Sequence, residues 1–412
     1  MGAGFLSSPP LYGNPGTLKS FTKNSPGNQH KNQQIAHLLT LKYSVSQLHL
    51  ITAVPLNVWQ GSGCYVGTRT LAQSLRQLGI GVRMVTPNIK TRVYTATRIL
   101  FNEALRWRHF DSDVTIGIDA DGYALVKNGN SPPHVACIKG VLADAIRFET
   151  GATRTSLMLQ AKMEAKHARR ADLVITVSRY CAERIEELYH VKGAVVVPEL
   201  IDLDVWRDLF RSNPKTPDPS KFTVLSVCRF YPRKRLDLLL LAATRFRKTI
   251  RHLEIRIVGS GPETRRLNQL CADLELTSTV RWLGNLPIAR LAEEYNRAHV
   301  FCLPSAQEGF GIVFLEAMAA GKPIVAARAA AVPEVVGNGL LVEPDNVEAL
   351  TEAILRLYRD PNLCHSLGLA GHRDVERFEM KRVARSFLGE VAKIAPAIKI
   401  SETGHLSEPM HS

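Results

Sequence analysis

The stretch Pro304–Pro323 reads P-S-A-Q-E-G-F-G-I-V-F-L-E-A-M-A-A-G-K-P, and it predicts the end of a strand, a turn and a helix. An apolar run over residues 299–303 precedes it and is typical of a short, buried parallel strand. The turn at 308–311 leads into an apolar helix that we expect over 312–320. This is the place where open α/β sheets bind ligands, because free N–H groups and the helix dipole attract negative charge there.

Two glycines and two carboxylates mark this turn. Gly309 and Gly311 permit φ > 0 and allow the backbone to approach a ligand closely. Glu308 and Glu316 frame the turn, and because a carboxylate repels a phosphate, their expected ligands are the hydroxyl groups of a sugar or ribose. In a simpler interpretation, one Glu is an exposed residue of the turn and the other is a helix residue that the helix dipole stabilises. This interpretation would explain a single Glu well, but it explains the pair less well.

This E-x7-E stretch resembles an element of the retaining glycosyltransferases of family four (glycosyl transferases group 1). These enzymes have the α/β fold called GT-B, in which two Rossmann-like, doubly wound domains face each other across a cleft. The resemblance implies that Glu308 contacts the donor sugar and that Glu316 contacts the nucleotide ribose. It also implies that the donor is bound by the turn residues Gly309, Phe310, Gly311 and Ile312.

Size and composition fit a two-domain globular protein. The chain has 412 residues, of which 45% are hydrophobic and 22% charged. We find no apolar run of the roughly 18 residues that a spanning helix needs, and no basic region followed by an apolar core at the N-terminus. The seven cysteines are scattered without a C-x-x-C pair, which predicts reduced thiols and a cytoplasmic protein.

The formal net charge of +14 favours anionic partners. No basic patch interleaved with aromatic residues and no nucleic-acid motif is found, so nucleic acid is not the expected partner. The excess positive charge is explained if the protein binds a nucleotide-diphosphate sugar and also attaches peripherally to the anionic inner face of a membrane. A basic surface without a specific partner is the open alternative.

The first half of the chain predicts a leader and one domain. Residues 1–44 are rich in Pro, Gly, Ser, Asn and Gln without periodicity, so we expect a disordered leader. Residues 45–205 are expected to form an N-terminal Rossmann-like acceptor domain. It begins with a strand over 47–54, an amphipathic helix and a second strand over 82–86.

The loop after the first strand contains Gly61, Ser62 and Gly63. Its glycine spacing does not match the dinucleotide fingerprint, and Thr86 stands where that fingerprint needs an acid, so an NAD enzyme is not expected. The family resemblance implies that this loop faces the donor phosphate across the cleft. A tight turn that merely starts a helix is the alternative interpretation.

Two further strands of this domain, 114–118 and 135–138, end in polar residues that we expect at the cleft. The spacing Asp119-x-Asp121 suggests a metal site, but the GT-B resemblance implies no metal, and Asp121 is interpreted as an acceptor-binding or structural residue. Lys139 stands where family members often have a His near the reacting sugar. It is a candidate for an acceptor or phosphate contact, and it puts the usual catalytic contact in doubt.

Residues 206–378 are expected to form the C-terminal Rossmann-like donor domain. A proline-containing polar linker between 202 and 221 includes its first residues. Arg229 and Lys234 follow its first strand, where cations suit an anion. They match the family's G-R-x-x-x-x-K-G element, which implies a clamp on the donor diphosphate, although the flanking glycines are replaced by Cys228 and Arg235. A basic strand end without a ligand is the alternative.

Gly259 and Gly261 resemble the family's V-G-x-G-P turn, which implies a place near the nucleotide base. We expect a last helix, 379–396, to pack back on the N-terminal domain, and a disordered tail over 397–412.

The predicted function is the transfer of a sugar from a nucleotide-diphosphate sugar to a glycan, lipid or small-molecule acceptor, with retention of anomeric configuration. The resemblance implies catalytic roles for Arg229, Lys234 and Glu308, and needs no metal or other cofactor. Two alternatives stay open: a sugar-nucleotide epimerase on the same fold, and a non-catalytic binding subunit, which Lys139 and the missing glycines favour.

Overall fold

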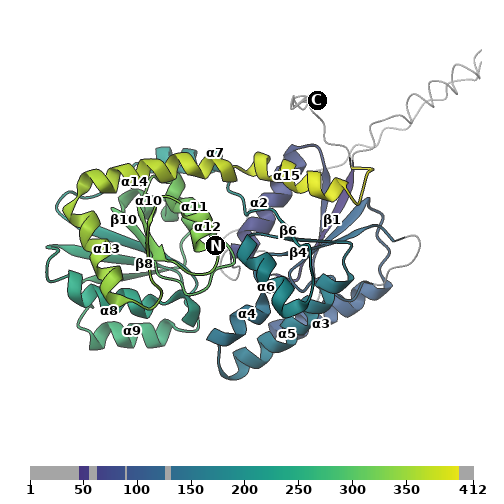
Figure 1. Cartoon of the computed structure of the whole chain (residues 1–412), viewed down its shortest axis with the longest axis horizontal. Coiled ribbons are helices and arrows are strands. Elements are labelled where there is room, and N and C mark those ends of the chain that lie inside the picture. Colours follow the sequence, from purple (N-terminus) through teal and green to yellow (C-terminus); the bar gives the residue numbers. More distant parts are fainter. Residues whose placement is uncertain (1–45, 55–62, 89–90, 126–130, 399–412) are drawn as a thin grey trace, which may run out of the picture. The chain divides into compact units, whose positions relative to one another are not determined.

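The computed structural model describes residues 46–54, 63–88, 91–125 and 131–398. They belong to one compact unit, residues 45–412, which contains two α/β domains (Figure 1). The expected leader, the tail beyond residue 398, and the loop residues Gly61 and Ser62 lie outside the described residues.

The N-terminal domain is built on a parallel six-stranded sheet with the order β2-β1-β3-β4-β5-β6. Its strands are β1 (Gln47–Ile51), β2 (Gly81–Val85), β3 (Val114–Ile118), β4 (His134–Ile138), β5 (Leu173–Thr176) and β6 (Val195–Val196). Its helices are α2 (Gly63–Gln77), α3 (Tyr94–Ala104), η1 (Leu105–Trp107), α4 (Leu142–Ala145), η2 (Ile146–Phe148), α5 (Gly151–Arg170) and α6 (Arg179–Tyr189).

The C-terminal domain repeats this plan with the parallel order β12-β11-β10-β7-β8-β9. Its strands are β7 (Phe222–Val227), β8 (Leu253–Val258), β9 (Val280–Gly284), β10 (Val300–Leu303), β11 (Ile324–Ala327) and β12 (Leu340–Val342). Its helices are α7 (Leu203–Ser212), η3 (Pro232–Lys234), α8 (Leu236–Phe246), α9 (Thr264–Asp273), α10 (Ile288–Arg297), α11 (Ile312–Ala319), α12 (Val332–Val335), α13 (Val347–Arg359), α14 (Pro361–Asp374) and η4 (Val375–Phe378).

In both domains the sheet is an inner layer covered by helices on its two faces (Figure 1). Buried parallel strands need apolar side chains on both sides, and β10 meets this requirement because all four of its residues are fully buried. The predicted unit of strand, turn and helix is confirmed: β10 pairs in parallel with β7 and β11, and α11 begins at Ile312. Both turns that follow β7 and β10 therefore lie at the same carboxyl edge of the sheet.

The expected linker between 202 and 221 is shorter than predicted. Residues Leu203–Ser212 form α7, and Asp202 starts it by accepting a hydrogen bond from the Val205 N–H at 3.0 Å. The helix is held by Trp206, whose ring lies 5.8 Å from that of Tyr295 in an edge-on contact. The spacing of Leu203, Trp206 and Phe210 was the signal for a helix, and the prolines beyond it obscured that signal.

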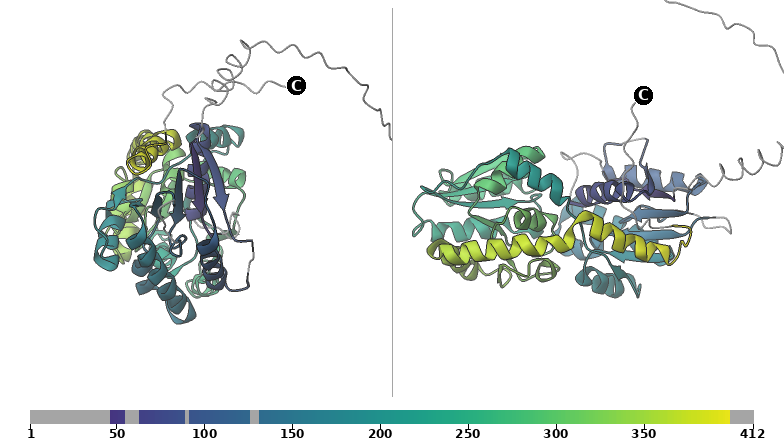
Figure 2. Two further views of the ribbon diagram at one scale, coloured as in Figure 1. Left: turned by 90° about the vertical axis from the view of Figure 1, so that its right-hand side faces the viewer. Right: turned by 90° about the horizontal axis from the view of Figure 1, so that it is seen from above.

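The chain crosses between the domains at two adjacent places. The Ile201 N–H donates to Phe378 O and the Met380 N–H donates to Ile201 O, each at 3.0 Å. The second crossing leads into α15 (Met380–Ala392). In Figure 2 the yellow C-terminal helices, α14 in the C-terminal domain and α15 on the N-terminal domain, follow one another across the two domains. The buried face of α15, including Phe387, joins the core of the N-terminal domain. Within the described residues, no helix is both long and apolar enough to span a bilayer.

Phe387→Ala tests this packing. Phe387 is 2% exposed in the core that α15 shares with β1 and α2, so its truncation is expected to cost about 3–5 kcal/mol of stability. Denaturant unfolding followed by circular dichroism is the measurement. Leu369→Ala on α14, where the side chain is 47% exposed, is the control that should leave the midpoint almost unchanged. Equal midpoints for the two variants would contradict the role of α15.

Candidate active site

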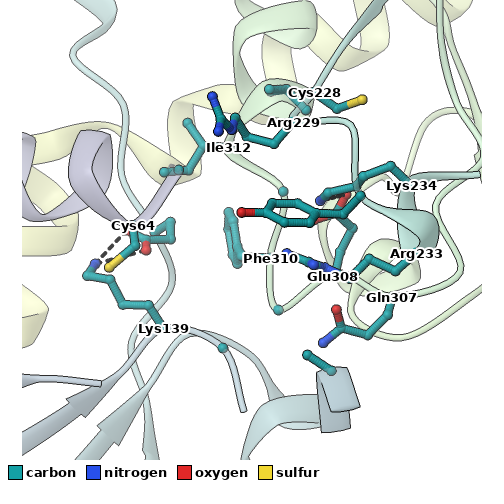
Figure 3. Close-up of a pocket in the computed structure, with 18 of the residues that line it drawn as sticks. Cys64, Lys139, Cys228, Arg229, Arg233, Lys234, Gln307, Glu308, Phe310 and Ile312 are labelled. Carbon is teal, nitrogen blue, oxygen red and sulfur yellow. Dashed lines mark hydrogen bonds and ion pairs between the residues drawn. The ribbon is translucent and has the colours of Figure 1, made fainter. Parts of the chain in front are cut away.

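One pocket is lined by residues of both domains (Figure 3). The C-terminal domain contributes the ends of β7 and β10, the helix η3 and the turn before α11. The N-terminal domain contributes the start of α2 and the segments that follow β3, β4 and β6. Because parallel strands place their carboxyl ends at one edge, each domain presents to the pocket the edge where such sheets bind ligands.

The predicted residues Lys234 and Glu308 meet in this pocket. Lys234 ends η3 and Glu308 begins the turn after β10, and Lys234 Nζ lies 2.6 Å from Glu308 Oε1. Their side chains are only 12% and 7% exposed. The lysine therefore keeps two further N–H donors for a ligand, and the carboxylate keeps its second oxygen as an acceptor.

Two arginines add positive charge beside this pair. Arg229 follows β7 and lines the pocket, and within the described part of the chain its guanidinium has no carboxylate within ion-pair distance. Arg233, which was not singled out from the sequence, lies 3.6 Å from Glu149. Burial raises the pKa of Glu149 and Arg233 opposes that rise. Arg229 is thus a cation available to an anionic ligand.

The turn itself is pressed against the N-terminal domain at Gly309. A Cβ atom at this position would stand 2.6 Å from Lys139 O and 3.1 Å from the Cα of Gly140, so a side chain does not fit. Ser178 Oγ donates to Gly309 O at 2.8 Å from the start of α6. The expected close approach at Gly309 is therefore one of protein backbone to protein backbone.

The next turn residues serve both packing and the pocket. Phe310 lines the pocket but is 5% exposed, and its ring stands perpendicular to that of Phe378 at 5.4 Å. Gly311 has φ = 92°, which favours glycine, and it is the N-cap of α11. Ile312 begins the helix and also lines the pocket, so the positive end of the α11 dipole is directed at the pocket.

Glu316 lies apart from these residues. It is 6% exposed and is not among the lining residues; its Oε2 accepts a hydrogen bond from Tyr295 Oη at 2.8 Å. Burial raises the pKa of Glu316 to about 7, and the Tyr295 hydrogen bond only partly opposes this. In this structure the side chain faces α10 rather than the pocket, and its expected contact with a ribose stays a prediction.

Gly259 and Gly261 lie in the turn after β8 and do not line the main pocket. Cβ atoms there would stand 1.8 Å from Cys228 O and 2.6 Å from Phe230 O. Because they lack a Cβ atom, the two glycines allow this turn to pack directly against the backbone of Cys228 and Phe230, the neighbours of Arg229. Gly261 also lines a separate, shallower hollow at the start of α9.

The wall opposite Glu308 is formed by a buried ion pair. Lys139 Nζ lies 2.8 Å from both carboxylate oxygens of Glu199, and the two side chains are 5% and 4% exposed (Figure 3). Burial would lower the pKa of Lys139, but Glu199 raises it overall. Burial raises the pKa of Glu199 and Lys139 opposes this; the two short contacts favour the ionised pair. The sequence suggested that Lys139 contacts a phosphate or an acceptor. In the structure its ammonium group is paired with the carboxylate of Glu199.

Asp119 and Cys64 complete this wall. Asp119 Oδ1 accepts from the Lys139 N–H at 2.8 Å, and Cys64 Sγ donates to Asp119 Oδ2 at 3.2 Å. Asp119 has φ = 52°, a backbone conformation in which Asp is one of the less strained residues. Gly63, next to Cys64, begins α2 and also lines the pocket; its contact with a donor phosphate stays a prediction.

Asp121 lies in the core of the N-terminal domain, which agrees with the structural one of its two interpretations; an acceptor contact stays a prediction. It is fully buried, pairs with Arg98 at 3.0 Å, and accepts hydrogen bonds from Asn102 Nδ2 at 2.9 Å and the Ala53 N–H at 2.7 Å. It does not line the pocket. Its carboxylate instead fixes the segment after β1 to α3.

Sequence reasoning missed several lining residues, namely Cys64, Glu199, Tyr231, Arg233 and Gln307. Arg233 stands beside the predicted Lys234, and Glu199 follows the short strand β6. Both residues therefore come after the carboxyl end of a parallel strand, and this position could have predicted that they line the pocket. Gln307 stands beside the predicted Glu308 and Cys64 beside the predicted Gly63, so the same signal was available for them.

The profile of the family described as glycosyl transferases group 1 matches residues 210–374, which include Arg229, Lys234, Glu308 and Glu316. The C-terminal domain of the chain is thus similar to this family. A GDP-mannose-dependent alpha-(1-6)-phosphatidylinositol monomannoside mannosyltransferase of Mycolicibacterium smegmatis is 30% identical over 49% of this chain and 56% of its own length. An MMP alpha-(1->4)-mannosyltransferase of Mycolicibacterium hassiacum is 33% identical over 54% of each chain.

The chain thus spans about half the length of these curated relatives. Two solved structures share its fold. Sucrose-phosphate synthase of Thermosynechococcus elongatus aligns with a TM-score of 0.72 and 21% identity, covering 86% of this chain and all of the other. WaaG, a glycosyltransferase involved in lipopolysaccharide biosynthesis, aligns with a TM-score of 0.65 and 14% identity over 85% of this chain and 99% of the other. The GT-B fold is confirmed.

Glu316→Gln should show a pH-dependent gain in stability. A carboxyl group whose pKa is raised to about 7 in the folded state stabilises at low pH, and this contribution is lost as pH rises from about 4.5 to 7. The stability of the variant relative to the original chain should therefore increase by about 2 kcal/mol between pH 5 and pH 7.5 in urea unfolding. Glu352→Gln on the exposed face of α13 is the control; a parallel response of both variants would contradict the assignment.

A double-mutant cycle tests the buried pair of Lys139 and Glu199. Lys139→Met or Glu199→Gln alone leaves an uncompensated buried charge or polar group and should cost about 3–5 kcal/mol. The double variant should cost clearly less than the sum, because both charges are then absent. Unfolding midpoints measure all three. Strictly additive losses would show that the two side chains do not interact.

Proposed function

We propose that this protein transfers a sugar from a nucleotide-diphosphate sugar to an acceptor with retention of anomeric configuration. The observation that carries the proposal is the ion pair of Lys234 and Glu308 in a pocket that Arg229 also lines. Arg229 has no carboxylate partner among the described residues. Cations there suit a diphosphate, and a carboxylate oxygen suits the hydroxyl groups of the attached sugar.

The charge distribution supports departure of a diphosphate. Negative charge grows on the leaving group as the glycosidic bond breaks, and Arg229, Lys234 and the N-terminus of α11 offer fixed positive charge to it. Each such contact is worth about 2–4 kcal/mol in a water-excluded site. The family resemblance implies that the departing phosphate accepts the acceptor's proton, so a separate protein base is not required.

The names of the relatives guide the choice of substrates. One acts with GDP-mannose on a phosphatidylinositol mannoside, so we take GDP-sugars as the first donors and lipid-linked or glycan acceptors as the first acceptors to test. We further propose that the protein works without a metal ion and without nucleic acid, and that it is cytoplasmic with peripheral attachment to an anionic membrane. EDTA should leave its turnover unchanged.

Removal of the proposed clamp tests the function. Arg229→Ala and Lys234→Ala should each lower turnover about 30- to 1,000-fold, the equivalent of 2–4 kcal/mol of lost charge stabilisation. Glu308→Ala should also lose turnover, while circular dichroism shows the fold retained. The measurement is transfer of radiolabelled sugar from GDP-, UDP- and ADP-sugars to extracted lipid and glycan acceptors. Lys248→Ala, on the surface after α8, is the control.

The outcome also separates the alternatives. Full activity in the three site variants would remove the proposed pocket. A changed donor without any acceptor would indicate an epimerase, which the transferase names of the relatives do not favour. Tight binding of a nucleotide sugar without turnover of any acceptor would indicate a non-catalytic binding subunit.

A further inference from the structure

A pair of buried histidines lies behind the N-terminal wall of the pocket. His134 begins β4 and His167 lies near the end of α5, and the two residues are 3% and 0% exposed. Their Nε2 atoms are 2.8 Å apart, so one nitrogen carries a hydrogen that it donates to the other. Neither residue lines the active-site pocket. The pair was not singled out from the sequence, and the proposed transfer does not use it directly.

The neighbours of the pair determine which nitrogen of each ring carries a hydrogen. His167 Nδ1 lies 2.5 Å from Asp119 O, and because a carbonyl oxygen only accepts, Nδ1 is the donor. Burial lowers the pKa of His167 to about 4, so its ring is neutral near pH 7 and its Nε2 has no hydrogen. His134 Nε2 therefore donates to His167 Nε2. In a neutral His134 ring, Nδ1 then accepts from Thr115 Oγ1 at 2.9 Å. The chain of hydrogen bonds thus runs in one direction, from Thr115 through both rings to Asp119.

Two glycines leave room for the pair. A Cβ atom at Gly117, inside β3, would stand 1.9 Å from Asp121 O and 2.7 Å from His167 Nε2. A Cβ atom at Gly122 would stand 2.8 Å from His167 Nε2 and 2.9 Å from His134 Nε2. A glycine inside a strand weakens it and often marks a close approach of other groups. Here the groups that approach are the turn after β3 and the two imidazole rings.

The pair does not belong to a metal site. Among the described residues, no group of three or more His, Cys, Asp or Glu side chains is arranged to hold a metal ion. The charged groups nearest to the pair are Asp121 and Arg98, which are paired with each other at 3.0 Å. The rings therefore act through their hydrogen bonds, and the group that they reach is Asp119.

Asp119 connects the pair to the pocket. Its φ of 52° is a left-handed backbone conformation, which costs free energy and persists only where the surroundings hold it. The Asp119 N–H donates to Cys137 O at 2.9 Å, and Asp119 O accepts from His167. Asp119 also lines the pocket, where its carboxylate accepts from the Lys139 N–H and from Cys64 Sγ, two residues that Figure 3 shows on this wall. The geometry of the wall thus depends on a backbone conformation that His167 stabilises from behind.

We propose that His167 and His134 are positioning residues for Asp119 and, through it, for the acceptor side of the pocket. The Asp119 carboxylate fixes the backbone of Lys139, whose ammonium group is paired with Glu199 in the same wall. Loss of the hydrogen bond from His167 allows Asp119 to leave its left-handed conformation, and the wall changes shape. The cations of the C-terminal domain stay in place. The effect on acceptor use rests on the proposed transferase function, whereas the chain of hydrogen bonds is a property of the folded protein.

Paired amide substitutions test the direction of this chain. The amide nitrogen of Asn can take the place of His Nδ1, and that of Gln can take the place of His Nε2. His167→Asn should therefore keep the hydrogen bond to Asp119 O, and His167→Gln should lose it. His167→Gln should lower kcat/KM for the acceptor about tenfold, as expected for one buried hydrogen bond, and leave KM for the nucleotide sugar unchanged.

At His134 the order of the two amides should be reversed, because Nε2 is the atom that donates to His167. His134→Gln should thus be more active than His134→Asn, with a smaller difference because His134 acts on Asp119 only through His167. Packing alone would favour the larger Gln at both positions. His365→Gln, exposed on α14, is the control that should match the original chain. Equal activity of Asn and Gln at His167, or a preference for Gln at both positions, would overturn the proposal.

Nitrogen-15 NMR of the original chain with labelled histidines tests the same point without any variant. We expect a hydrogen on Nδ1 of His167 and on Nε2 of His134, and a coupling between the two Nε2 atoms across their hydrogen bond. That coupling identifies the pair. A hydrogen on Nε2 of His167, or no coupling, would overturn the proposal even if the variants failed to fold.

Alkylation of Cys64 by iodoacetamide, followed by mass spectrometry, reports on Asp119 without any substrate. Burial and the nearby Asp119 raise the pKa of the Cys64 thiol, which keeps it protonated and slow to react. In His167→Gln this thiol should react several times faster than in His167→Asn, with the partly buried Cys364 as internal reference. Equal rates would contradict the link between His167 and Asp119. If no acceptor receives a sugar, the transferase proposal fails, while NMR and alkylation still decide the role of the two histidines.

Discussion

The start of α6 is the point on which the site depends. Ser178 accepts a hydrogen bond from the Cys181 N–H at 3.1 Å, which caps the helix, and the same hydroxyl donates to Gly309 O at 2.8 Å. The carboxylate of Glu334 accepts from the Arg179 and Tyr180 N–H groups, each at 2.8 Å. Two acceptor groups of the C-terminal domain thus bind donors at a helix end in the N-terminal domain. A helix N-terminus favours a carboxylate through its dipole and its free N–H groups.

This docking determines what faces the pocket. It presses the turn at Gly309 against Lys139 and Gly140, so that Glu308 and Lys234 on one side face the pair of Lys139 and Glu199 on the other. Each side contains a nearly neutral pair of opposite charges. The net attraction for an anion therefore comes from Arg229 and from the start of α11, both of which belong to the C-terminal domain. The N-terminal wall offers mainly carboxylate oxygens and one shared ammonium, which suits neutral hydroxyl groups.

The sequence was most informative where local pattern and long-range packing agree. The apolar run of β10 and the glycine at the start of α11 are local signals, and the structure contains both elements. The proximity of Arg229, Lys234 and Glu308 could be predicted from the sequence, because the carboxyl ends of parallel strands lie at one edge of the sheet. Side-chain direction could not be predicted in the same way. Glu316 follows Glu308 by eight residues, but its rotation on α11 directs it to Tyr295, and Asp121 is withdrawn from the cleft by Arg98 and Asn102. These outcomes depend on partners from other elements, which no spacing reveals.

The paired crossings at Ile201 and Met380 have a mechanical consequence. Both covalent connections pass between the domains side by side and are tied to each other by backbone hydrogen bonds, so they act as one pivot. A rotation about this pivot would leave both six-stranded ladders whole. It would break the hydrogen bonds of Gly309 and Glu334 to α6, the ion pair of Arg233 with Glu149, and apolar contacts in the cluster that both domains share. A rotation of this kind would widen first the part of the pocket that lies farthest from the pivot.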